Sequence, residues 1–137
     1  MWRVLLIALA LVGCAQVPPT PHEMQAKRFE PVADRSVIYV VRDYPDHNDV
    51  PATILLDGAA SITTYPGTFY RWEVPAGKHR IAGFAADAGA IQLDTAPGRI
   101  YFVQQTLMAF QRFPTSIFRV VGEQQGRAVA SRAQLIP

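Results

Sequence analysis

The sequence predicts an all-β fold, a small antiparallel β-sandwich, with a possible short helix at the C-terminal end. Short runs rich in β-branched and aromatic residues recur at intervals of about 10 to 15 residues, a spacing typical of sandwich strands. Turn-forming pairs such as Asp57-Gly58 and Pro97-Gly98 separate some of these runs. Beyond Gly122 the composition changes to Ala, Gln and Arg, and the strand pattern stops.

The predicted elements follow one another with short connections. Each strand combines residues that favour extended backbone, and several end at a turn signal. The helix is expected in Glu123 to Leu135, where apolar residues recur with roughly helical spacing. In chain order the expected strands are Ser36 to Arg42, Ala52 to Leu56, Thr68 to Val74, His79 to Phe84, Ala90 to Thr95, Arg99 to Met108 and Phe118 to Val121.

Alternation within the strand Thr68 to Val74 assigns its two faces. Tyr70 and Trp72 fall on the same side and are predicted to enter the core, whereas the residues between them are charged. The turn Pro75 to Lys78 then predicts a hairpin that sets Trp72 opposite Ile81, because a slip of one residue would exchange the two faces.

The N-terminal segment has the pattern of a secretory signal peptide. Arg3 precedes an unbroken apolar run from Val4 to Val12, which is far shorter than the roughly 20 residues that a membrane-spanning helix needs. The run ends at Gly13-Cys14, and Cys14 is the only cysteine in the chain. A cysteine at this point resembles the bacterial lipoprotein signal. The resemblance implies cleavage before Cys14, attachment of a diacylglycerol to its thiol, and acylation of the new amine, for example by palmitate.

Three regions are expected along the chain. Residues 1–13 are the predicted signal peptide, 14–35 the lipidated cysteine with a proline-rich tether, and 36–137 the sandwich domain. Ala15 follows the cysteine in place of the Asp that retains many proteobacterial lipoproteins in the inner membrane. The lipoprotein resemblance therefore implies a lipid anchor in the cell envelope, at the outer membrane and facing the periplasm.

The charge pattern argues against nucleic acid as a partner. The chain has 13 Lys and Arg residues against 11 Asp and Glu residues, and no block of like charges interrupts the sequence. Attachment to the membrane is therefore expected through the lipid and not through a basic patch.

Four segments carry a resemblance to a known family: Ile38 to Arg42, Leu56 to Gly58, Phe69 to His79 and Ala96 to Val103. The clearest of them contains the turn V-P-A-G-K-H. Together they resemble a family of small bacterial lipoproteins of unknown function with a PEGA-like or prealbumin-like β-sandwich domain, over roughly Val37 to Val121. The resemblance implies a β-sandwich and an envelope location, and it implies no catalytic residues.

One loop carries a dense group of possible ligands for a metal ion. Asp43, Asp46, His47 and Asp49 lie within seven residues. The segment lacks the central glycine of a calcium loop, and an exposed connection between strands has the same composition. A solvated loop without a metal is therefore favoured, and replacing Asp46 and His47 is expected to leave stability unchanged.

Other chemistry has weaker support. No nucleophile elbow, zinc-binding helix, phosphate-binding loop or paired-cysteine motif is present in the sequence, so we expect no catalytic residues and no cofactor. Phe69, Tyr70 and Trp72 form a possible aromatic platform, but alternation favours the core for Tyr70 and Trp72. His79 is interpreted as a structural histidine at the rim of the domain.

These observations favour a non-enzymatic module that binds or scaffolds another envelope protein or envelope component. The alternative is a module that binds a glycan, peptidoglycan or a metal ion. A concave polar pocket would favour the alternative, and an exposed apolar surface would favour a protein partner.

Overall fold

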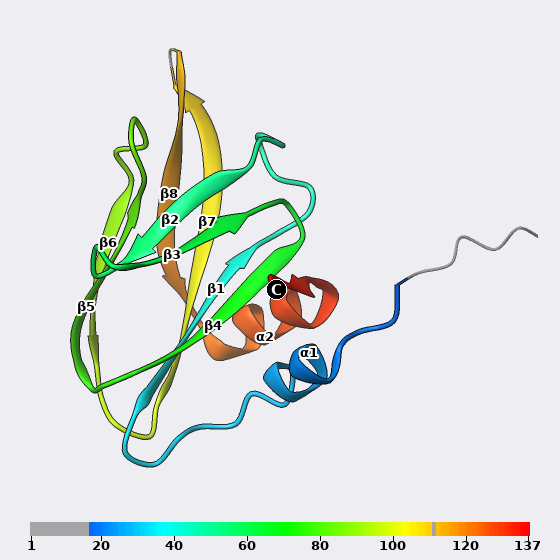
Figure 1. The fold of residues 1–137 in the computed structure, drawn as a ribbon, viewed down its shortest axis with the longest axis vertical. Helices are drawn as coiled ribbons and strands as arrows, with labels where there is room; N and C mark the ends of the chain where they lie inside the picture. Colours follow the sequence, from blue (N-terminus) through cyan, green and yellow to red (C-terminus); the bar gives the residue numbers. More distant parts are fainter. Residues whose placement is uncertain (1–16, 111) are drawn as a thin grey trace, which may run out of the picture.

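The computed structural model describes residues 17–110 and 112–137 (Figure 1). The predicted signal peptide and Cys14 lie outside these residues. Within the described chain, no helix combines the length and the apolar character needed to cross a membrane. The elements are α1 (Pro21–Ala26), β1 (Ser36–Arg42), β2 (Ala52–Leu56), β3 (Ala60–Thr64), β4 (Thr68–Val74), β5 (Gly77–Gly83), β6 (Ala90–Thr95), β7 (Ile100–Phe110), β8 (Phe113–Val121), α2 (Glu123–Arg132) and β9 (Gln134–Leu135).

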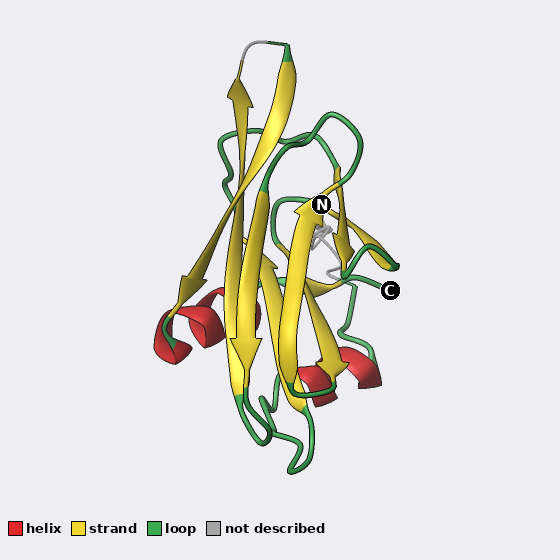
Figure 2. Ribbon diagram, turned by 90° about the vertical axis from the view of Figure 1, so that its left-hand side faces the viewer, coloured by secondary structure: helices red, strands yellow, loops and turns green. Residues whose placement is uncertain are grey.

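The strands form two sheets, which confirms a mostly β fold. One sheet has the order β8-β7-β1-β4-β9, and the other has the order β3-β2-β5-β6 (Figures 1 and 2). The prediction of a purely antiparallel arrangement is wrong for two pairs, because β1 with β7 and β4 with β9 run parallel. The chain leaves the first sheet after β4, builds β5 and β6 in the second, and re-enters at the end where β1 begins. This route makes β7 parallel to β1.

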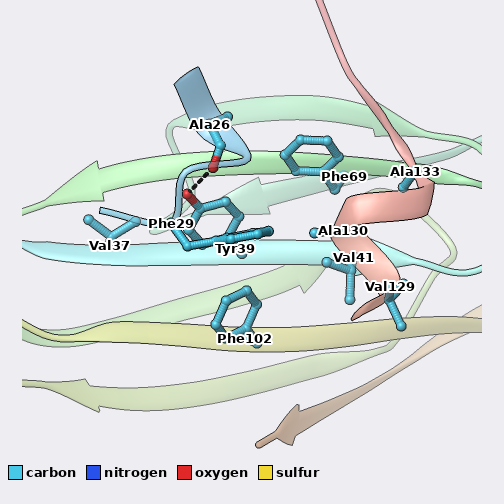
Figure 3. Packing of buried hydrophobic residues seen from close by; sticks show 10 residues of the cluster. All are labelled: Ala26, Phe29, Val37, Tyr39, Val41, Phe69, Phe102, Val129, Ala130 and Ala133. Carbon is cyan, nitrogen blue, oxygen red and sulfur yellow. Dashed lines mark hydrogen bonds between the residues drawn. The ribbon is translucent and has the colours of Figure 1, made fainter. Parts of the chain in front are cut away.

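Strand β1 is buried along its whole length because both faces of its sheet are covered. Val37, Tyr39 and Val41 face the two helices, where they meet Phe69 and other side chains of one apolar cluster (Figure 3). The alternate residues of β1 face the second sheet. There Ile38 and Val40 pack with Ile54, Leu56, Trp72, Val74, Ile81, Leu93 and Val103.

The predicted hairpin between β4 and β5 is wrong, although its side chains enter the core as expected. β4 pairs with β1, which sets Trp72 opposite Ile38, and β5 pairs with β2 and β6 in the other sheet. Pro75 and Ala76 therefore carry the chain from one sheet to the other. Trp72 and Ile81 still share one cluster, because they face each other across the sandwich and not along a ladder.

The packed domain begins earlier than the expected boundary at Ser36. The hydroxyl of Thr20 accepts the amide hydrogen of Glu23 at 3.1 Å and caps α1. Ala26 and Phe29 are buried in the helix-facing cluster, and the Tyr39 hydroxyl donates to the Ala26 carbonyl at 2.6 Å. The predicted tether of residues 14–35 is therefore too long, since its second half belongs to the core.

The C-terminal helix is confirmed, but it ends before Leu135, which lies in β9. Helix α2 approaches the sheet closely at Gly126. A Cβ at this position would lie 2.1 Å from Cγ of Phe102, so only glycine fits. Strands β3 and β9 were not expected from the sequence.

Candidate functional site

The acidic loop between β1 and β2 folds around an arginine and not around an open ligand site. Asp46 accepts a hydrogen bond from Nε of Arg42 at 2.6 Å, and the two side chains are 0 % and 4 % exposed. The amide of Leu107 on β7 also donates to Asp46, at 3.1 Å. Asp43 pairs with Arg132 of α2 at 2.7 Å. The expectation of a wholly solvated loop is therefore wrong for Asp46. His47 and Asp49 are exposed.

Arg42 is the largest fully buried side chain of the described residues. Its guanidinium donates to the carbonyl oxygens of Asn48 at 2.5 Å, Val50 at 2.9 Å and Thr64 at 3.2 Å. With Asp46, these acceptors surround the charge, which satisfies the rule that a buried ion needs both a counter-ion and hydrogen bonds. Arg42, the last residue of β1, therefore holds the loop in its observed conformation through these hydrogen bonds.

A chain of polar side chains continues from this site into the end of the sandwich. Thr64 donates to Gln105 at 2.8 Å, Gln105 donates to Ser116 at 2.8 Å, and Ser116 donates to Asp87 at 2.5 Å. The amide of Ser116 also donates to Asp87, at 2.7 Å. This network was not predicted from the sequence. The available signal was Gln105, a polar residue on the same face of its strand as two buried apolar residues.

A different polar pair lies at the opposite end of the sandwich. Nδ1 of His79 is 2.6 Å from Asp57, and Nε2 is 2.6 Å from the Pro75 carbonyl. Partial burial opposes the charged ring, but the hydrogen bonds to Asp57 and Pro75 outweigh it and raise the pKa of His79. For Asp57, burial is likewise outweighed by hydrogen bonds from His79 and from the Arg80 amide, which lower its pKa. The geometry matches a structural histidine at the rim.

A groove of about 680 Å³ runs beside α1 and β4. Its walls come from α1, the segment before β1, β4, and the C-terminal residues after α2, so it joins both ends of the described chain. The groove mixes apolar and charged side chains, which suits a partner with both characters. Its lining includes Val32, Tyr70, Arg71, Glu73, Leu135 and Ile136.

The groove follows a stretch of sheet edge that β9 leaves open. β9 pairs only with Thr68 and Phe69, and the amides of Gln134 and Ile136 donate to the carbonyls of Gly67 and Phe69. Strand alternation then directs the backbone groups of Arg71 toward the same side. In the part of the chain that the structure describes, no strand pairs with β4 there. The groove is thus bordered by backbone donors and acceptors.

No metal site is formed within residues 17–110 and 112–137, where no group of three or more His, Cys, Asp or Glu side chains is placed to hold an ion. In the acidic loop, Asp43 and Asp46 instead bind arginines. Comparison with known proteins adds no assignment, because no family model and no curated protein matches the chain.

Proposed function

We propose that this chain is an envelope lipoprotein, anchored through lipid on Cys14, whose β domain is a non-enzymatic module that binds or scaffolds a partner. The anchor places the domain at the outer membrane, facing the periplasm. The partner is another envelope protein or envelope component. The groove beside β4 is the observation that carries the binding role.

Three properties of the groove support the binding of a partner. Its volume lies in the range of roughly 300 to 1,000 Å³ that is typical of small-molecule pockets, so a partner would enter it with a short segment or a small group. Apolar side chains such as Tyr70 and Leu135 line it together with Arg71 and Glu73, and the backbone of the open β4 edge offers hydrogen bonds. Thr20 also borders the groove, so a bound partner would lie close to the point where the tether enters the domain.

The lipid anchor is tested by replacing its only attachment point. Cys14→Ser should remove palmitate labelling and release the chain from the membrane fraction, because no other cysteine is present. Separation of the two membranes on a density gradient tests the outer-membrane assignment for the unchanged chain. Retention of palmitate by the variant would contradict the proposal.

The binding role is tested by photo-crosslinking in cells. A crosslinking residue at Arg71 should give a discrete adduct, whereas one at Lys78, an exposed position outside the groove, should not. Adding Val32→Glu to the Arg71 reporter should reduce the adduct about tenfold, equivalent to about 1.4 kcal/mol of binding free energy. Equal adducts at Arg71 and Lys78 would show that crosslinking reflects random collisions and would contradict binding in the groove.

A further inference from the structure

All four exposed aromatic side chains of the described residues lie at one end of the sandwich. They are Tyr44, Tyr65, Phe84 and Phe113, with exposed fractions of 71 %, 50 %, 58 % and 58 %. Tyr44, Tyr65 and Phe84 lie in the β1–β2, β3–β4 and β5–β6 connections, and Phe113 is the first residue of β8, next to the β7–β8 connection. In Figure 1 the β1–β2 and β5–β6 connections and the start of β8 lie in the upper part of the domain, and the β3–β4 turn lies below them on the right. We call this set the aromatic end.

The opposite end of the sandwich has a different character. Its connections are residues 57–59, 75–76 and 96–99, and they contain only Asp, Gly, Ala, Pro and Arg. The exposed aromatic residues are therefore not scattered over the links between strands, because residues 57–59, 75–76 and 96–99 contain none of them.

Hydrogen bonds and close packing hold the loops of the aromatic end in fixed positions. Asp46 ties the β1–β2 loop to β7, and Asp87 ties the β5–β6 loop to Ser116 on β8. Cβ of Tyr44 lies 3.4 Å from where a Cβ on Gly67 would be, so the β1–β2 loop packs on the β3–β4 turn. These contacts fix the loops that carry Tyr44, Tyr65 and Phe84, and Phe113 precedes the bonded Ser116 by three residues on β8.

We propose that the aromatic end inserts its side chains into the interfacial region of the lipid bilayer that anchors the chain. This inference rests on the proposed function, because it takes the lipid on Cys14 as the anchor. Phe and Tyr contribute apolar area at the level of the headgroups, where the Tyr hydroxyl stays hydrated. Arg112, exposed beside Phe113, supplies a cation for lipid phosphate.

The shape and charge of this end favour a bilayer over a glycan or a folded protein. The groove beside α1 and β4 and the pocket around Phe29 and Arg99 are lined by none of the four aromatic side chains. Asp43 and Asp46 are already paired with arginines, and Asp87 accepts hydrogen bonds from Ser116. Pairing of these carboxylates reduces their repulsion of an anionic lipid surface.

The tether makes weak insertion sufficient. Five residues separate Cys14 from Thr20, where the packed domain starts, and the six residue steps between them span at most about 20 Å when extended. A domain held so close to the bilayer meets it at a high effective concentration, so low intrinsic affinity still gives high occupancy. The aromatic end then fixes the orientation in which the groove is presented.

Vesicle binding by the unlipidated processed chain tests the inference directly. The protein starts at residue 14, carries Cys14→Ser and retains every described element; the probe is a vesicle of phosphatidylethanolamine and phosphatidylglycerol. Because the intrinsic affinity is expected to be low without the tether, the assay uses a lipid concentration high enough to detect weak partitioning, and there we expect measurable flotation with the vesicles. The combination Tyr44→Ser, Tyr65→Ser, Phe84→Ser and Phe113→Ser should lower the partition coefficient at least about tenfold.

A matched control changes exposed apolar residues away from the aromatic end. Met24→Ser, Ile117→Thr and Val120→Thr should leave partitioning within about twofold of the parent. Absence of flotation by the parent, or equal losses in both combinations, would overturn the inference. Because this protein has no lipid, neither result depends on whether Cys14 is acylated, and palmitate labelling of the full chain tests that question separately.

A second measurement covers the case in which the fourfold variant fails to fold. In the unlipidated chain, Phe113→Trp should be quenched by vesicles containing brominated lipid, and Met24→Trp should not. The buried Trp72 gives the same background in both proteins. Quenching at residue 24 but not at residue 113 would place the other side of the domain on the bilayer and overturn the inference.

Discussion

Two ion pairs at opposite ends of the sandwich have the same length and different surroundings. Arg42 with Asp46 and His79 with Asp57 each have a nitrogen-to-oxygen distance of 2.6 Å, and in both a strand residue binds a carboxylate from a connection. The side chains of the first pair are 0 % and 4 % exposed, whereas those of the second are 10 % and 43 % exposed.

Distance alone therefore does not set how much an ion pair contributes to stability. Water screens the Asp57 carboxylate, and exposed pairs contribute about 0 to 1 kcal/mol. Removing one member of a buried pair leaves the other charge without water or a partner, and this costs about 3 to 5 kcal/mol. The loop around Arg42 should therefore depend on its ion pair, and the turn around His79 should not.

The largest expected effect is that of Arg42→Met. We expect the free energy of unfolding to fall by about 3 to 5 kcal/mol, because Asp46 and the carbonyls of Asn48 and Thr64 lose their donor inside the protein. Urea unfolding of the variant measures this loss. A change below about 1 kcal/mol would show that water enters this end of the sandwich and that the two ion pairs are equivalent.

The same substitution at both carboxylates gives a direct comparison. Asp46→Asn should destabilise by about 1 to 3 kcal/mol, because an amide cannot balance the buried charge of Arg42. Asp57→Asn should have an effect of about 1 kcal/mol or less, since 43 % of that side chain is exposed and water screens its charge. Parallel urea titrations test both. Equal losses would refute the assignment of the difference to burial.

The pH dependence of stability should reveal the exposed pair. Because the pKa of His79 is raised in the folded state, its contribution is complete below the unfolded value of about 6.5 and disappears as pH rises through the folded value. The pKa of Asp57 is lowered in the folded state. Its contribution to stability is therefore complete above the unfolded pKa of about 3.9 and is lost as pH falls through the folded pKa.

His79→Gln should therefore remove a shallow decline in stability above about pH 6.5, with an amplitude of about 1 kcal/mol or less. Thermal unfolding of the parent and the variant across neutral pH measures this difference. If the decline persists in the variant, a group other than His79 causes it. If the stability of the parent instead rises with pH in this range, the predicted direction of the His79 effect is wrong.

The pattern of residue types predicts where strands lie and which of their faces are buried better than it predicts which strands pair. β1, β2, β4 and β6 occur where expected because β-branched and aromatic runs with turn signals specify extended backbone locally. The assignment of β4 to a hairpin failed because alternation defines which face of a strand is buried, but several neighbours can cover that face. Phe29 was missed because a single aromatic residue after a short helix has no periodic signal.

The candidate sites were predictable to different degrees. The loop from Asp43 to Asp49 stands out by composition, but its partner Arg42 reads as the polar end of an apolar strand. Only the folded chain brings Arg42 together with Asn48 and Thr64. The groove depends on the end of β9 and the path of the segment before β1, and neither follows from a local pattern.

The smallest expected effect concerns the part of the acidic loop that does not touch Arg42. His47 is exposed, and the backbone amide of His47 already binds Asp46 at 2.7 Å, so its imidazole is not needed to hold the loop. We expect His47→Ala with Asp49→Asn to change stability by less than about 0.5 kcal/mol, in contrast to Asp46→Asn. Calorimetric titration with calcium and zinc should detect no stoichiometric binding at micromolar metal, because binding would require Asp43 and Asp46 to leave arginine partners. One-to-one binding that the double variant abolishes would show that the loop can exchange those partners for an ion.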